Sequence, residues 1–189
     1  MKRRNFLITP SALALGAAAG AAATVPGIAL AAPSIITPQS RILPRTGKGP
    51  RIVICGGGWG GMTAARYLRE LIPHSDVVLL ERNPTFWSGP MSNKWLIDVV
   101  NTDFVNHDML RPANKYGYQL LQCEVNGFER DKKLVHTSHG VIDYDYLIVG
   151  AGIRYNYEAW FGNDRKAADY TKAHFPAAYI PNAQHLALK

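Results

Sequence analysis

The sequence predicts an α/β fold built on a parallel β-sheet. Three features predict it: two short runs of β-branched and aliphatic residues, a glycine-rich turn after the first run, and a helix-forming segment between the turn and the second run. The runs are residues 51–55 and 77–80, and the turn is residues 56–61. A strand, a turn, a helix and a strand within about 30 residues form a βαβ unit with parallel strands and a right-handed crossover.

The helix of this unit is expected over residues 62–71. Ala65, Leu68 and Leu71 recur at helical spacing and place an apolar stripe on one side. Pro73 ends the helix, because proline has no N–H to donate and its ring clashes with the preceding turn. The second strand follows and ends at Glu81.

The elements after Glu81 are predicted less sharply. Residues 82–91 are expected to form a loop, residues 92–100 a helix capped by Ser92 or Asn93, and residues 107–116 a short helix interrupted near Pro112. Residues 119–125 resemble a strand, and the polar residues 130–133 indicate a turn between two strands, which adds a β-hairpin to the fold. Residues 141–143 lead into a buried strand over 146–149, and beyond residue 162 the pattern weakens.

The N-terminal residues 1–31 have the organisation of a signal peptide. A basic start is followed by an apolar stretch without charge and by the small residues Ala29-Leu30-Ala31 at the cleavage spacing. The pair Arg3-Arg4 followed by Phe6-Leu7 resembles a twin-arginine export signal, which predicts a periplasmic protein and the twin-arginine export machinery as a partner. An uncleaved membrane anchor is the alternative, which the glycines and Pro26 within the stretch disfavour.

The rest of the chain divides into three further parts. Residues 32–50 carry four prolines with Ser and Gly, which predicts an extended linker. Residues 51–162 are expected to form the folded domain, and residues 163–189 an incomplete tail.

Composition and charge exclude several classes of protein. A chain of 189 residues that is 47% hydrophobic and has two cysteines is neither a disordered tail nor a disulfide scaffold. The formal net charge is +7, but loss of residues 1–31 leaves 18 basic against 14 acidic residues, or +4. The remaining basic residues are scattered, so no nucleic-acid partner is expected. The six histidines show no metal-ligand spacing, so no metal site is expected.

The glycine-rich turn carries the functional signal. Gly56, Gly58 and Gly61 satisfy G-x-G-x-x-G after a strand and before a helix, and Glu81 follows Gly61 by 20 residues at the end of the second strand. The glycines permit the tight turn, the approach of a pyrophosphate and close helix–sheet packing, while the carboxylate binds a ribose. This predicts a Rossmann-like domain that binds FAD or NAD. A glycine-rich turn without a ligand is the alternative.

Two further stretches carry a family resemblance. Residues 81–93 read ERNPTFWSGPMSN and residues 144–152 read YDYLIVGAG. With the glycine turn, they resemble the N-terminal part of the flavoprotein subunits of flavocytochrome c sulfide dehydrogenases, and more distantly sulfide:quinone reductases. These proteins have the pyridine nucleotide-disulfide oxidoreductase type of fold with two dinucleotide domains. The resemblance spans residues 51–162 and implies an incomplete FAD-binding Rossmann-like domain.

The resemblance implies roles for individual residues. The glycine turn would hold the pyrophosphate of FAD, and Glu81 with Arg82 the adenosine ribose. The backbone of Val125 would meet the adenine, Gly152 would close over the cofactor, and Ser92 and Asn93 would lie near the flavin. The implied cofactor-binding residues are Gly56, Gly57, Gly58, Trp59, Gly60, Gly61, Glu81, Arg82, Asn93, Val125 and Gly152. Catalytic residues are not assigned.

Two departures from the family qualify these expectations. The cysteine that attaches FAD covalently in the sulfide dehydrogenase subunit is matched here by Gly89, which predicts non-covalent FAD. The family's redox-active cysteine pair has no counterpart at Cys55 or Cys123, and the second dinucleotide domain is absent. We therefore expect the chain to be a fragment or a truncated gene product.

The resemblance implies an FAD-dependent oxidoreductase. In the complete enzyme, reduced sulfur would give two electrons to the flavin, and a cytochrome c subunit or a quinone would accept them. The alternatives are an NADH dehydrogenase or quinone reductase of the same fold, and a non-catalytic nucleotide-binding remnant.

Overall fold

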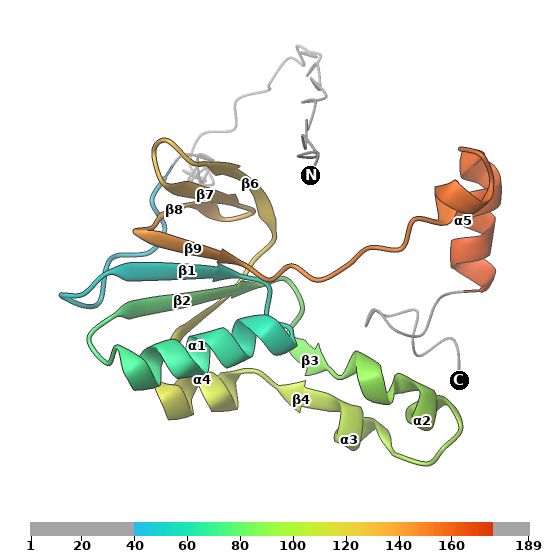
Figure 1. Ribbon diagram of the computed structural model, residues 1–189, viewed down its shortest axis with the longest axis horizontal. Helices are drawn as coiled ribbons and strands as arrows, with labels where there is room; N and C mark the ends of the chain where they lie inside the picture. The colour runs from blue at the N-terminus through green and yellow to red at the C-terminus, as the bar shows by residue number, and fades with distance from the viewer. Residues whose placement is uncertain (1–39, 176–189) are drawn as a thin grey trace, which may run out of the picture. The chain divides into compact units, whose positions relative to one another are not determined.

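Four parallel strands form the central sheet of the protein in the order β5-β2-β1-β9 (Figure 1). The computed structural model describes residues 40–175. The strands are β1 (Arg51–Cys55), β2 (Asp76–Glu81), β5 (Gln119–Gln122) and β9 (Tyr146–Val149). Because β2 and β9 flank β1 on opposite sides, the sequence order of the strands reverses at β1. The predicted parallel α/β fold is confirmed.

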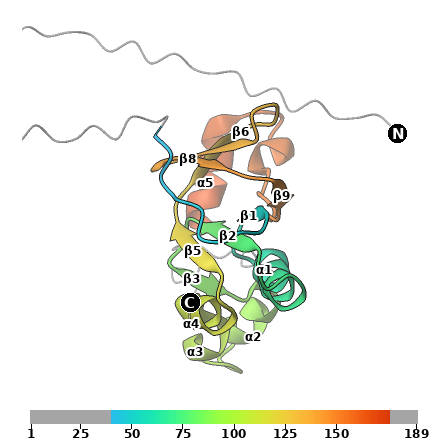
Figure 2. The same cartoon turned by 90° about the vertical axis from the view of Figure 1, so that its left-hand side faces the viewer.

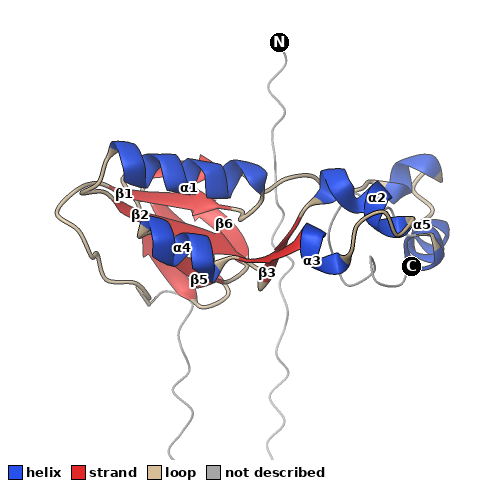
Figure 3. Ribbon diagram, turned by 90° about the horizontal axis from the view of Figure 1, so that it is seen from below, coloured by secondary structure: helices blue, strands red, loops and turns tan. Residues whose placement is uncertain are grey.

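Two helices cover one face of this sheet (Figure 3). These are α1 (Trp59–Leu71) and α4 (Leu110–Tyr116), and Ala65 and Ala113 pack beneath them on Ile52, Ile54, Val77 and Leu79. Helix α1 begins at Trp59, earlier than the expected residue 62. Gly60 and Gly61 therefore lie in its first turn, where close packing of Gly61 against the strand outweighs the low helix propensity of glycine.

A three-stranded antiparallel sheet covers the other face (Figures 1 and 2). It consists of β6 (Val125–Glu129), β7 (Leu134–Thr137) and β8 (Gly140–Asp143). Val135 and Ile142 pack on the central sheet together with Cys55 and Cys123. The turn expected over 130–133 joins β6 to β7, so the added hairpin is present and is extended by a third strand.

The segment between β2 and α4 differs most from expectation. Its elements are β3 (Thr85–Trp87), η1 (Gly89–Met91), α2 (Ser92–Leu96), α3 (Thr102–Val105) and β4 (Asn106–Asp108). The helix expected over 92–100 ends at Leu96, and Asp98 has a left-handed φ of 59° that no helix continues through. The helix expected from 107 begins at Leu110, so Pro112 lies in its first turn, where no donor is lost.

Residues 41–50, within the range predicted as a linker, lie along the domain. Arg41 pairs with Val141, and Ile42 and Leu43 pack against the core between the two sheets. The fully buried side chain of Arg51 binds this segment. Its guanidinium donates hydrogen bonds to the carbonyls of Leu43 and Pro44 and to the carboxylate of Asp76. This part of the chain therefore contributes to the core.

The last described elements are η2 (Tyr157–Trp160) and α5 (Arg165–His174), and the side chain of Asp164 caps α5 by accepting from the N–H groups of Lys166 and Ala167. Among residues 40–175, no helix is long and apolar enough to cross a membrane. The expected signal peptide of residues 1–31, with its alternative as an anchor, lies outside the described residues.

Candidate functional site

The glycine turn leaves β1 through a backbone that only glycine tolerates. Gly56 has a φ of +106°, and a Cβ on it would lie 2.3 Å from the carbonyl oxygen of Gly150. Its N–H donates to the carbonyl of Leu80 over 2.8 Å, which ties the turn to the end of β2. The first glycine therefore permits the tight turn that the motif predicts.

Gly61 and Gly58 fill the other two positions in different ways. A Cβ on Gly61 would lie 1.8 Å from the carbonyl oxygen of Gly56, so only glycine lets α1 approach the strand this closely. A Cβ on Gly58 would meet nothing within 4 Å, which means that open space lies over this residue. The turn thus has one glycine that packs and one that leaves room for a ligand.

The start of α1 faces this open space with an uncapped end. Gly58 is its N-cap, no side chain caps the helix, and no acidic residue lies in its first turn. The first N–H groups of a helix have no partner within the helix, and the dipole places partial positive charge there. This end of the 13-residue α1 can therefore hold a phosphate.

The carboxylate of Glu81 lies beside the turn. Its Oε2 accepts from the N–H of Gly57 over 2.6 Å, and its Oε1 accepts from the backbone N–H and the side-chain amide of Asn83. A carboxylate offers about four acceptor positions, so one remains for a hydroxyl donor. Its negative charge disfavours a phosphorylated ribose at this position.

These groups lie where the strand order reverses. The N–H of Gly150 after β9 donates to the carbonyl of Cys55, and the N–H of Cys123 after β5 donates to that of Glu81. The carboxyl ends of all four parallel strands therefore meet around the glycine turn. Ligands of open α/β sheets bind outside these ends, at the point of reversal.

The other predicted site residues are placed as follows. Arg82 is exposed directly after Glu81, and Val125 is half-buried at the start of β6, two residues after Cys123. Gly152 follows β9 with a φ of +74° and open space around it. Asn93 is exposed on α2, and no described contact joins it to the glycine turn.

Ser92, which the resemblance places near the flavin, is buried and has a local role. Its hydroxyl donates to the carbonyl of Gly89 over 2.6 Å, so it closes the turn between η1 and α2.

Sequence reasoning missed two neighbours of the turn, Phe86 and Met109. The ring centroids of Trp59 and Phe86 are 5.2 Å apart, with the rings perpendicular to each other. A Cβ on Gly57 would lie 2.4 Å from the terminal methyl of Met109. Phe86 belongs to a strand that was expected as loop, and Met109 precedes α4 without any local motif. Although Trp59 packs against Phe86, the residue is 60% exposed.

The two thiols near the site are unreactive at neutral pH. Burial, and secondly the neighbouring Cys123, raise the pKa of Cys55 to about 12. Burial also raises the pKa of Cys123. Both cysteines are free and buried, so they stay protonated at neutral pH and do not act as nucleophiles. Residues 40–175 contain no group of three or more His, Cys, Asp or Glu that could hold a metal ion.

Comparison with known proteins agrees with this geometry. Among curated proteins, the type II NADH:quinone oxidoreductase of Staphylococcus aureus is 23% identical over 104 residues, which are 54% of this chain and 26% of the relative. The matched part thus spans about a quarter of the relative's length.

Solved structures share the fold. The sulfide:quinone oxidoreductase from Aquifex aeolicus superposes with a TM-score of 0.55 and 24% identity over 57% of this chain and 25% of that protein. An NAD-dependent persulfide reductase from A. fulgidus gives a TM-score of 0.53 and 19% identity over 57% of this chain and 22% of that protein.

The family model of the pyridine nucleotide-disulphide oxidoreductases matches residues 12–169, most of the chain. With its Rossmann-like sheet and a glycine turn at the point of strand reversal, the chain belongs to the pyridine nucleotide-disulphide oxidoreductase family.

Proposed function

We propose that this chain binds FAD without a covalent bond at the glycine turn and acts as the FAD-binding part of an oxidoreductase. The observation that carries the proposal is the hydrogen bond from Gly57 to Glu81 beside the open space over Gly58. It sets a ribose acceptor next to a phosphate site, which is the pair of groups that an adenine dinucleotide needs. Members of the family are flavoproteins, which supports FAD as the dinucleotide.

Each part of the turn has a defined task in this proposal. The N–H groups at the start of α1 hold the pyrophosphate, and the open face of Gly58 lets it come close to the backbone. The free acceptor position on Glu81 receives a ribose hydroxyl. When bound, FAD supplies the redox chemistry, and the protein orients it and excludes competing reactions.

For the electron donor and acceptor, we propose reduced sulfur and either a quinone or a cytochrome c subunit. The sequence resemblance to sulfide dehydrogenases supports this choice, and the likeness in fold to a sulfide:quinone oxidoreductase agrees with it. The two cysteines of this chain are buried with raised pKa values, so neither thiol is expected to handle sulfur.

NADH is the second candidate donor. The curated proteins that match this chain include NADH:quinone oxidoreductases, over about half of this chain. The motifs described above support both donors.

Two measurements test the cofactor proposal. The purified full chain should show the visible absorption of oxidised flavin, either as isolated or after addition of FAD and removal of the excess. Acid precipitation should then leave the flavin in the supernatant. A chain that stays colourless with excess FAD would support the non-catalytic remnant, and flavin in the pellet would contradict non-covalent binding.

The donor is tested by anaerobic reduction of the bound flavin. Anaerobic addition of sulfide or of NADH to the flavin-loaded protein should bleach the flavin with only one of them. Bleaching by sulfide supports the sulfur donor, and bleaching by NADH alone supports the second candidate.

We further propose export to the periplasm through the twin-arginine route. The motivation is the pair Arg3-Arg4 before an uncharged apolar stretch. Replacing both arginines with lysine should leave unprocessed protein in the cytoplasm, and normal periplasmic yield would overturn the proposal.

A further inference from the structure

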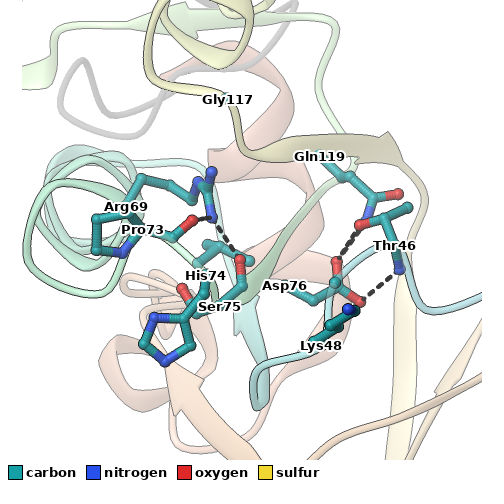
Figure 4. A pocket seen from close by; sticks show the side chains of 11 residues that line it. Thr46, Lys48, Arg69, Pro73, His74, Ser75, Asp76, Gly117 and Gln119 are labelled. Atoms are coloured by element: carbon teal, nitrogen blue, oxygen red, sulfur yellow. Dashed lines mark hydrogen bonds between the residues drawn. The ribbon is translucent and has the colours of Figure 1, made fainter.

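A cleft lies at the amino ends of the parallel strands, at the opposite edge of the sheet from the glycine turn. Its volume is about 330 Å³, and its lining includes Thr46, Lys48, Arg69, His74, Asp76 and Gln119 (Figure 4). Asp76 begins β2 and Gln119 begins β5, whereas the glycine turn follows the end of β1. The cleft is therefore separate from the proposed dinucleotide site.

The one acidic lining residue of this cleft is already paired with a buried cation. Asp76 is 2% exposed, and its Oδ2 accepts from the Nε of the buried Arg51 over 2.7 Å. Its Oδ1 accepts from the hydroxyl of Thr46 and the amide of Gln119. The carboxylate is thus paired with Arg51, which also forms an ion pair with Asp143, and its acceptor positions are occupied.

The positive charges of the cleft have no such balance. Lys48 and Arg69 form no ion pair with any residue in the described range 40–175. Figure 4 shows Arg69 on one side of the cleft and Lys48 with Asp76 on the other. Two cations on opposite walls of a small cleft attract an anion that reaches both.

The guanidinium of Arg69 is held in place with one edge unused. Its Nη1 donates to the carbonyls of Pro73 and Ser75, which fixes the group. Its Nε is buried without a hydrogen-bond partner, and no described hydrogen bond uses Nη2. Nε and Nη2 form one edge of the planar group, which binds two oxygens of a phosphate side by side.

Gly117 leaves this edge of Arg69 free of a side chain. A Cβ on Gly117 would lie 3.6 Å from Nη2 and 3.8 Å from Nε, in van der Waals contact. Nη2 is not among the buried atoms and has no described hydrogen bond, so an anion in the cleft can accept from it.

We propose that this cleft binds the phosphate group of a small molecule, with Arg69 and Lys48 as its cationic contacts. A dianion suits two cations better than a carboxylate does, because each cation then meets a charged oxygen. The volume of the cleft leaves room beside the phosphate for a small ester group. This site is independent of the proposed dinucleotide site and of the redox activity.

The test is an NMR titration of the isotope-labelled full chain at constant ionic strength, with inorganic phosphate and with glycerol 3-phosphate as probes. Both probes should shift the backbone amide signals of Gly47, Ser75 and Gly117 in a saturable way. Tighter binding of glycerol 3-phosphate would indicate a phosphate ester as the ligand, and equal binding would indicate the free ion.

The test variant is Lys48→Gln, which removes a charge from an exposed side chain with no described partner and should fold normally. It should weaken phosphate binding about fivefold, as expected for one exposed charge contact. The matched control is Arg130→Gln in the turn between β6 and β7, which should bind phosphate like the original chain. Shifts that do not saturate, shifts confined to residues 57–61, or unchanged affinity in Lys48→Gln would overturn the proposal.

Discussion

The Oε2 atom of Glu81 accepts a hydrogen bond from the backbone N–H of Gly57 over 2.6 Å. The bond joins the end of β2 to the turn after β1 and positions the carboxylate beside the open face of Gly58. Asn83 holds the other carboxylate oxygen through two further hydrogen bonds. The acidic group and the phosphate site are thus fixed relative to each other before a ligand arrives, which lowers the ordering cost of binding.

The substitution Glu81→Gln should weaken FAD binding about tenfold and lower the melting temperature slightly. The amide oxygen can still accept from Gly57, but the NH2 group then faces the two donors of Asn83, and hydrogen bonds from a ribose to a neutral amide are weaker than those to a carboxylate. Titration by quenching of flavin fluorescence measures the effect. Glu124→Gln, on an exposed side chain, is the control and should leave the affinity unchanged. Equal affinity in Glu81→Gln would remove Glu81 from the site.

The substitution Gly61→Ala should lower the free energy of unfolding by about 2 kcal/mol or more, because the new Cβ would lie 1.8 Å from the carbonyl oxygen of Gly56. Gly60→Ala, one residue earlier in the same helix turn, meets nothing within 4 Å and should be neutral or slightly stabilising. Chemical denaturation of the two variants tests the contrast. Equal stabilities would mean that α1 does not pack on the strand as described.

The aspartates around Arg45 and Arg51 should make stability depend on acid pH. Burial alone would raise the pKa of Asp76, but hydrogen bonds from Arg51 and Thr46 outweigh it and hold the pKa below its usual value. Hydrogen bonds from the Arg45 side chain and the Arg51 backbone lower the pKa of Asp145. Depressed folded-state values add stability above the unfolded pKa, and this stability is lost as the pH falls below it.

The stabilisation from these carboxylates should therefore be nearly constant above about pH 5, and the melting temperature should fall steeply below about pH 4. Asp145→Asn removes one of the groups and should melt earlier at neutral pH but with a shallower fall on acidification. Melting curves recorded from about pH 3 to about pH 7 measure both effects. A fall of the same steepness in the variant would exclude Asp145 from the acid response.

The two thiols should resist modification in the folded protein. Burial keeps Cys55 and Cys123 protonated, and a thiol reagent reacts with the thiolate. Native protein at pH 8 should therefore react with less than one reagent per chain over the time in which unfolded protein reacts with two. Fast reaction of the native protein would contradict the burial and would reopen a redox role for the cysteines.

The central sheet was predictable because its strands are short apolar runs bounded by glycine, proline or charge, as in Arg51–Cys55 and Tyr146–Val149. The glycine turn was predictable because Gly56 and Gly61 are required sterically and Gly58 keeps the space over the turn open. The segment from Thr85 to Asp108 was not, because its short strands pair with each other rather than with the main sheet, and no local pattern encodes that pairing. Long-range contacts likewise decide that residues 41–50 join the core, where Arg51 binds their carbonyls.

Titration of the full chain and of Gly58→Val with FAD tests the central claim most directly. Gly58 has an extended backbone with φ of −75° and ψ of −168° and no neighbour in the Cβ direction, so valine should fold without strain. We expect saturable FAD binding by the original chain and at least about a hundredfold weaker binding by the variant, since the side chain occupies the pyrophosphate position. The circular dichroism should be unchanged and the melting temperature slightly lower, because valine is a poorer helix N-cap than glycine. Equal FAD binding by both proteins would show that the dinucleotide does not lie on the glycine turn.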